Sequence, residues 1–143
     1  MKKFELTTEN IVKWGRTLFR IKALVSFGDV EKGELGGFVE KEENLDQYGN
    51  AEVYGNAEVF KMSHYLVIGP MGSRNGFTTF FRTKNPFIGV TCGCFRGNVD
   101  EFVEKVKETH RDNKHAKAYF AAADLAKLQI DLTPEENGCQ SNH

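Results

Sequence analysis

The chain has 143 residues, of which 40% are hydrophobic and 27% are charged. These values are usual for a folded domain and exclude a chain that is disordered throughout. A net charge of -1 leaves no basic excess to displace counterions from bulk nucleic acid. No apolar run reaches the length of about 20 residues that crosses a bilayer, and no apolar segment follows the first residues. We therefore expect a cytoplasmic protein that binds neither membranes nor bulk nucleic acid.

The first predicted elements are short strands at residues 4–7 and 16–24, with a hairpin or broken turn between them. A glycine-rich stretch at residues 27–37 follows. We expect it to turn the chain into the next segment. A nucleotide-binding loop is the alternative interpretation of these glycines, but no strand-to-helix pattern surrounds them.

Residues 49–60 contain a six-residue unit written twice, Gly-Asn-Ala-Glu-Val-Tyr and then Gly-Asn-Ala-Glu-Val-Phe. An aliphatic residue at every sixth position, here Val53 and Val59, is typical of a β-helix. Residues 37–60 therefore predict a short left-handed parallel β-helix, with Glu52 and Glu58 on its solvent face. Roughly three repeats are needed for a stable stack, and this one is shorter. Its apolar side chains must therefore pack against the rest of the chain or against other copies of the protein, so we expect a homo-oligomer.

After residue 64 the apolar pattern changes to a period of two. Residues 65–68, 77–82 and 87–92 predict three strands, separated by loops rich in glycine, proline and asparagine. Connections this short favour an antiparallel meander.

Helical signals begin at Asn98, where Glu101 three residues later completes a capping box. This helix is expected to end near His110, and a second one to begin near Asn113. Both helices should cover one side of the sheet.

The predicted fold class is therefore α+β, with a short left-handed parallel β-helix joined to an antiparallel sheet that two C-terminal helices cover. We expect an N-terminal domain at residues 1–62, a sheet-and-helix domain at residues 63–132, and a flexible tail at residues 133–143.

Two glycine-containing loops in the second half each carry one arginine. In the first, crowded backbone N–H groups and a guanidinium can hold an anion. The second leads toward a helix N-terminus, where the dipole favours a negative ligand, and a nearby ring can stack on a base. Each feature also has a purely structural interpretation: the glycine-containing loops are turns, Asn98 caps the helix, and the phenylalanine rings belong to the core. The predicted ligand-binding residues are Gly72, Ser73, Arg74, Asn75, Phe80, Phe95, Arg96 and Asn98.

Catalytic and metal-binding patterns are scarce. None of the histidines has a serine or cysteine at a recognisable activating spacing. Cys92 and Cys94 are expected to be reduced and to pack as small apolar groups on one face of a strand. A zinc site would need further ligands, which His110, His115 and Cys139 supply only in a fold that the sequence does not establish. We expect no catalytic residue, no metal and no cofactor.

The spans 18–24, 27–30 and 35–40, together with the Tyr-Gly-Asn-Ala repeats, resemble hexapeptide-repeat proteins common in phages and prophages. The spans 65–70, 72–75, 92–95 and 108–110 resemble the domain that often follows such repeats. The resemblance implies a left-handed β-helix and a trimer or a multiple of it. It also implies an acyltransferase as one possible activity, with His64 as the comparable histidine, although the stack looks too short for the coenzyme A groove.

A small oligomeric phage protein with arginine- and glycine-containing loops is similar in kind to phage sponges, which sequester nucleotide immune signals. The expected function is therefore non-enzymatic binding of a small anionic ligand, of cyclic nucleotide or cyclic ADP-ribose type, in an infected bacterial host. This analogy is one of type and not of sequence motif. A structural or protein-binding phage component is the alternative, and a nucleotide-processing enzyme is the third.

Overall fold

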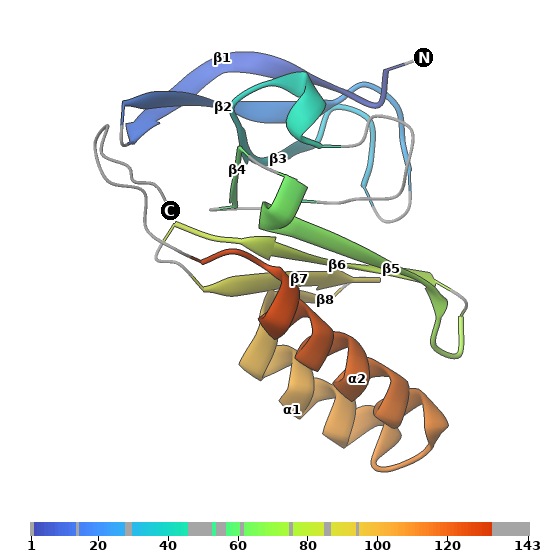
Figure 1. Cartoon of the computed structure of the whole chain (residues 1–143). Coiled ribbons are helices and arrows are strands. Elements are labelled where there is room, and N and C mark those ends of the chain that lie inside the picture. Colours follow the sequence, from blue (N-terminus) through green and yellow to red (C-terminus); the bar gives the residue numbers. More distant parts are fainter. Residues whose placement is uncertain are drawn as a thin grey trace.

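The computed structural model describes residues 2–13, 15–27, 30–45, 53, 57–60, 62–74, 76–84, 87–93 and 95–132, without the side chains of Lys13 and Met62. These residues form three layers, which are a first β-sheet, a second β-sheet and a pair of helices (Figure 1). The second sheet is the middle layer, with the first sheet on one face and the helices on the other. The predicted α+β class agrees with this arrangement.

The first sheet contains β1 (Phe4–Lys13), β2 (Arg16–Ala23), β3 (Leu35–Val39) and β4 (Glu58–Val59), in that order. The first three strands pair antiparallel, and β4 pairs parallel to β3. β1 runs well beyond the predicted residues 4–7. Residues 7–10 are polar, but pairing with β2 continues past a register shift between Leu6 and Asn10 and holds this part of the strand extended.

The predicted left-handed parallel β-helix is wrong. The described residues of this region contribute the end of β3 and the two-residue strand β4, which pair parallel at the edge of a mixed sheet. Val53 and Val59 do not line a prism but are buried in the core between the two sheets, beside Phe81. Two copies of a six-residue unit are too few to bury their own apolar side chains, so these residues pack on the neighbouring sheet instead. The rest of the predicted coil, residues 46–52 and 54–56, lies outside the described residues.

Glu58 also departs from the prediction. The repeat predicts it on a solvent face, yet it is 1% exposed, because β4 lies between β3 and the second sheet. Ala57, one residue earlier, forms an isolated antiparallel bridge to Thr83 at the end of the second sheet. The repeat region therefore joins the two sheets.

The second sheet is an antiparallel meander of β5 (Tyr65–Met71), β6 (Gly76–Arg82), β7 (Ile88–Cys92) and β8 (Phe95–Asn98). The three predicted strands and their antiparallel order are confirmed. Sequence reasoning missed β8, because Phe-Arg-Gly-Asn before a helix is typical of a loop. Pairing with β7 makes these residues a strand.

The helices α1 (Val99–His110) and α2 (Lys114–Gln129) cover the face of the second sheet that is turned away from the first sheet (Figure 1). The capping box of α1 is confirmed, since the Asn98 side chain accepts from the Glu101 N–H and the Glu101 carboxylate accepts from the Asn98 N–H. Asn113 caps α2 in a similar way, through the Ala116 N–H. Among the described residues, no helix is long and apolar enough to cross a membrane.

Adjacent phenylalanines on β6 belong to two different cores. Phe80 packs with both helices, whereas Phe81 packs against the first sheet. Successive side chains of a strand point to opposite faces, so a sheet that is covered on both sides needs apolar residues at consecutive positions. The run Phe-Thr-Thr-Phe-Phe in β6 meets this need.

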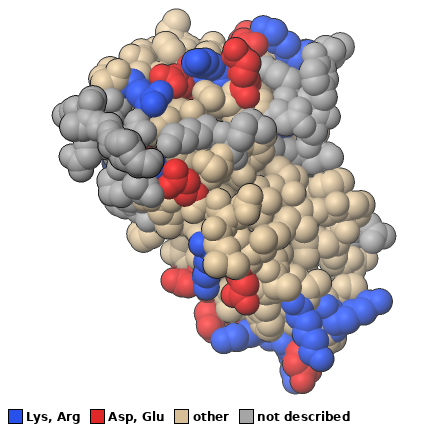
Figure 2. All heavy atoms as spheres, in the orientation of Figure 1, with Lys and Arg blue, Asp and Glu red and all other residues tan. Residues whose placement is uncertain are grey.

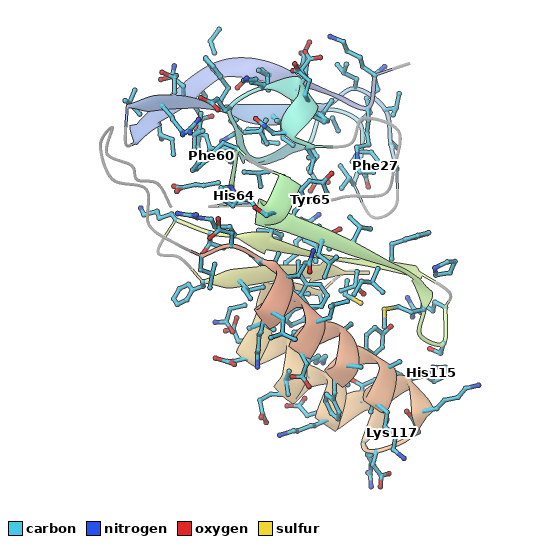
Figure 3. All side chains as sticks on the ribbon, viewed as in Figure 1. Phe27, Phe60, His64, Tyr65, His115 and Lys117 are labelled. Atoms are coloured by element: carbon cyan, nitrogen blue, oxygen red, sulfur yellow. The ribbon has the colours of Figure 1, made fainter. Side chains whose placement is uncertain are left out.

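A buried polar cluster closes one end of the space between the sheets. His64 Nδ1 accepts from the Phe60 N–H at 3.2 Å, and His64 Nε2 lies 3.2 Å from Nη1 of Arg82. The same Nη1 donates to the Asp131 carbonyl at 3.3 Å, and the Asp131 N–H donates to the Ser63 carbonyl at 2.9 Å. These contacts tie the chain after α2 back to the entrance of β5. Figure 3 shows His64 between Phe60 and Tyr65 at this junction, with Phe27 toward the other end.

A candidate binding pocket between the two sheets

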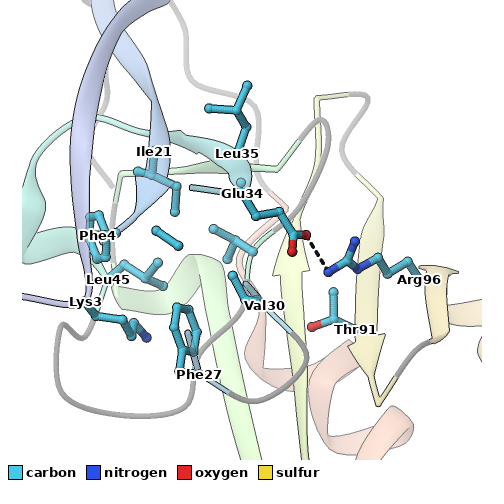
Figure 4. A pocket seen from close by; sticks show the side chains of 13 residues that line it. Lys3, Phe4, Ile21, Phe27, Val30, Glu34, Leu35, Leu45, Thr91 and Arg96 are labelled. Carbon is cyan, nitrogen blue, oxygen red and sulfur yellow. Dashed lines mark hydrogen bonds and ion pairs between the residues drawn. The ribbon is translucent and has the colours of Figure 1, made fainter. Parts of the chain in front are cut away.

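The pocket lies at the end of the inter-sheet space away from His64 (Figures 3 and 4). Its cavity volume is about 20 Å³, within about 400 Å³ of empty space that includes open solvent, so a small molecule would enter as the lining side chains move apart. The first sheet and its loops supply an apolar floor, and the second sheet supplies polar side chains. The lining consists of Lys3, Phe4, Ile21, Ala23, Phe27, Val30, Glu34, Leu35, Gly36, Leu45, Val53, Thr91 and Arg96.

The polar side of the pocket is the end of a row that crosses the second sheet. Strand register places Val67 beside Thr79, Thr79 beside Thr91, and Thr91 beside Arg96. Thr79 and Thr91 are 1% and 2% exposed. Hydroxyls this deeply buried between two sheets require hydrogen-bonding partners, and a polar patch in an apolar interface is more informative than another apolar residue.

Arg96 and Glu34 form an ion pair across the pocket. Nη2 of Arg96, on β8, lies 2.8 Å from Oε2 of Glu34, which directly precedes β3 (Figure 4). Both side chains are about 30% exposed, at 27% and 30%. The pair therefore links the two sheets and faces the pocket while it remains within reach of solvent.

A second cation lies on the opposite side of the pocket. The Lys3 ammonium is 4.6 Å from the centroid of the Phe27 ring, and Lys3 is 4% exposed. Phe27 belongs to the loop between β2 and β3, which the bridge between Phe27 and Val30 closes. Figure 4 shows Lys3 and Phe27 on one side of the space and Arg96 and Thr91 on the other. Two cations and one carboxylate thus surround an apolar floor.

The first predicted loop lies apart from this pocket. Ser73 and Arg74 are exposed in the turn between β5 and β6, and Asn75 lies outside the described residues. Gly72 has φ of +80°, and a side chain there would run into the Tyr119 hydroxyl of α2. This loop therefore approaches the helix layer and not the pocket. It lies at the same end of the second sheet as the turn after Cys92.

The second predicted loop is divided between the two faces of β8. Arg96 points into the pocket, whereas Phe95, its neighbour, packs on Phe102 of α1 with ring centroids 5.6 Å apart. Phe80 is fully buried and also packs on Phe102, at 6.0 Å. Asn98 uses its side-chain oxygen to cap α1. Of the seven predicted site residues that the structure describes, Arg96 is the one that lines the pocket.

Sequence reasoning missed Lys3, Phe27, Glu34 and Thr91. Lys3 stands beside the first strand as an ordinary surface lysine would, and Phe27 and Glu34 lie within a stretch whose glycines are typical of a turn. The available signal was Thr79 and Thr91, two threonines at central positions of apolar strands. Their pairing partners depend on register, which the sequence alone does not give.

A separate polar contact lies on the helix side of the second sheet. The Thr78 hydroxyl donates to the Cys92 sulfur at 3.2 Å, and the Tyr119 hydroxyl is hydrogen-bonded to the same sulfur. Burial raises the pKa of Tyr119 to about 12, with further contributions from the charge of Cys92 and from this hydrogen bond. Cys92 ends β7 and packs against the helical core, and Gly93 follows it in a turn with φ of +58°. Cys94, the other cysteine predicted on that face, lies outside the described residues.

His64, the residue comparable with an acyltransferase histidine, is fully buried in the polar cluster that it forms with Arg82. Within the described part of the chain, no group of three or more His, Cys, Asp or Glu side chains is arranged to hold a metal ion. Compared with known protein families, curated proteins and solved structures, the chain matches none. The resemblance to phage hexapeptide-repeat proteins therefore stays a prediction.

Proposed function

We propose that the protein binds a small anionic ligand of nucleotide type between its two sheets and releases it unchanged. In the cytoplasm of an infected bacterium, such a protein would sequester a nucleotide immune signal, of cyclic nucleotide or cyclic ADP-ribose type. The observation that carries the proposal is the pocket with Lys3 and Arg96 on opposite walls of an apolar floor.

Each part of a nucleotide has a counterpart among the lining side chains. A phosphate would take the place of the Glu34 carboxylate on the Arg96 guanidinium, which favours bidentate anions. The base would lie against the Phe27 ring and the apolar floor. The Glu34 carboxylate and the Thr91 hydroxyl would then accept from ribose hydroxyls.

The charge balance of the lining supports a ligand with few negative charges. Lys3 and Arg96 together carry two positive charges, and Glu34 carries one negative charge that offsets one of them. Arg96 is held in the paired strand β8, whereas Lys3 and Glu34 directly precede β1 and β3, so the ligand would meet one fixed cation and adjustable groups around it. These features favour holding a compact ligand.

The test measures binding to a panel of cyclic dinucleotides, cyclic mononucleotides and cyclic ADP-ribose isomers by calorimetry. A bound compound is then released by heat and identified by chromatography. We expect it to return unchanged, whereas a nucleotide-processing enzyme would return a product. A protein that binds no member of the panel would favour the alternative, a structural or protein-binding phage component.

Two arginine variants locate the site. Arg96→Ala should weaken binding by about 10- to 150-fold, because a hydrogen bond to a charged group contributes about 1.5–3 kcal/mol. Arg74→Ala is the matched control, since Arg74 is exposed in the β5–β6 turn and should bind as the wild type does. The reverse pattern, with Arg74→Ala weakened and Arg96→Ala unchanged, would move the site to the β5–β6 turn.

A further inference from the structure

α2 has a second apolar face that points away from the core. Its inner face carries the buried residues Ala116, Ala122, Ala123 and Ala126. Its outer face carries four apolar residues that are all exposed, with Leu125 at 44% and Leu128 at 86%. We call these four residues the outer stripe; they are Ala118, Ala121, Leu125 and Leu128.

The spacing of the outer stripe is that of a helix-pairing seam. Its members stand at intervals of three, four and three residues, which keeps them on one line along a helix. Surface leucines scattered singly are common, but two leucines and two alanines in this order form a continuous strip. In the view of Figure 2 the surface over the middle of α2 is mostly uncharged, while Lys and Arg side chains gather near its N-terminal end.

From this stripe we propose that α2 pairs antiparallel with α2 of a second copy, about a two-fold axis near residue 123. The stripe has small residues in its first half and large ones in its second half. Antiparallel pairing therefore sets Leu128 of one copy over Ala118 of the other, and Leu125 over Ala121. Every leucine meets an alanine, so the two surfaces interdigitate. Parallel pairing would set leucine on leucine and leave a gap at the alanines.

The charged residues beside the stripe do not add to this arrangement. Lys117 and Asp124 are exposed on one flank, seven positions apart. About a two-fold axis near residue 123, Lys117 of one copy lies opposite Gln129 of the other and the two Asp124 side chains approach each other, so these charges limit the strength of the pair. A self-complementary patch of this kind defines a closed dimer and not an open chain of subunits.

One helix pair buries less than the roughly 800 Å² per partner of a standard interface, so the dimer should be weak. The full-length protein is examined by sedimentation equilibrium from about 10 µM to about 1 mM. We expect the weight-average mass to rise toward that of two chains. A protein that stays monomeric over this range contradicts the proposal.

The pairing is tested with Leu128→Glu and Ala118→Lys, each of which should raise the dissociation constant at least about tenfold. Val12→Glu is the control, because Val12 is 69% exposed on β1, outside the stripe, and should leave the association unchanged. Circular dichroism of each variant confirms that the fold is retained. Dimerisation that Leu128→Glu leaves intact would place the interface elsewhere.

Mixing the two stripe variants tests the register. In the antiparallel pair, the carboxylate introduced by Leu128→Glu in one chain faces the ammonium introduced by Ala118→Lys in the other, while the remaining Leu128 and Ala118 still meet. The mixture should therefore form a heterodimer although neither variant pairs with itself. Failure of the mixture to associate would overturn the antiparallel register. None of these measurements involves a ligand, so their outcome is independent of the proposed function.

Discussion

The Tyr119 hydroxyl is enclosed by groups from three different elements. The turn after β5 approaches it through Gly72, β7 supplies the Cys92 sulfur, and the Phe102 ring of α1 packs edge-on at 5.5 Å. A phenolate in this position would lose hydration and would be disfavoured further by the electrostatic effect of Cys92. Both effects favour the neutral phenol, and burial is the larger of the two.

Tyr119 is predicted to titrate at about pH 12, above the ordinary tyrosine value of 10.0. Because the folded protein holds this proton more tightly than the unfolded chain, the associated stability is fully present below pH 10 and is lost as the pH rises toward about 12. The absorbance at 295 nm, compared between the wild type and Tyr119→Phe, measures the titration. Cys92→Ser should lower this pKa partway, since burial remains. A Tyr119 titration near 10 in the wild type would contradict this assignment.

Single residues also show how far the sequence defines the site. Arg96 stands out in the sequence for its place before a helix N-terminus, yet its side chain points to the opposite face, toward Glu34. The sequence suggests one ligand for Phe95 and Arg96, but consecutive residues of a strand face opposite sides. The missing information was that residues 95–98 form a strand. Only the pairing partner in β7 determines that.

The elements differ in how local their signals are. Both helices are predicted with accurate starts, because the caps Asn98 and Asn113 act within one turn. β4 falls within the predicted β-helix, but its place as a two-residue edge strand of a mixed sheet is not predicted, because that depends on pairing with the distant strand β3. The six-residue repeat points to a β-helix, which a longer stack could have formed. In this chain, packing between the sheets determines the structure instead.

The close approach of β3 and the bridge residue Ala57 can be tested with one methyl group. A Cβ on Gly37 would lie 2.6 Å from the Ala57 Cβ and 3.2 Å from the Ala57 carbonyl oxygen. We expect Gly37→Ala to lower the free energy of unfolding by about 1–3 kcal/mol, as overpacking does. Urea denaturation followed by circular dichroism measures the change.

Gly76→Ala is the matched control for this glycine. Gly76 also lies in a strand, but no heavy atom lies within 4 Å of a Cβ added there. Its unfolding midpoint should stay close to that of the wild type. Equal losses of stability in the two variants would mean that the close contact with Ala57 is not the reason why a side chain at residue 37 destabilises the fold.

In the whole molecule, both faces of the second sheet are covered. The helices bury Phe80, Ile88 and Val90 on one side, and the first sheet buries Phe81 on the other. The middle layer therefore takes part in two cores. The proposed division at residues 62 and 63 stays a prediction, but it separates two layers that share the core around Phe81.

A fragment of residues 63–132 is predicted to be much less stable than the full chain. Without the first sheet, Phe81, Tyr65 and Val67 would face water, and Phe81 alone contributes about 1.5–3 kcal/mol through burial. The fragment should melt at a lower temperature and bind the dye ANS. An unchanged melting temperature would show that residues 63–132 fold without help from the first sheet.

Strand β7 is the partition between the proposed pocket and the helix layer. Thr91 lines the pocket, while Val90 and Cys92 on either side of it contact the helical core. A ligand that displaces Thr91 must carry its two neighbours along, because they belong to one stretch of paired backbone. Amide resonances of α1 and α2 should therefore serve as remote reporters of ligand occupancy, although no helical residue lines the pocket.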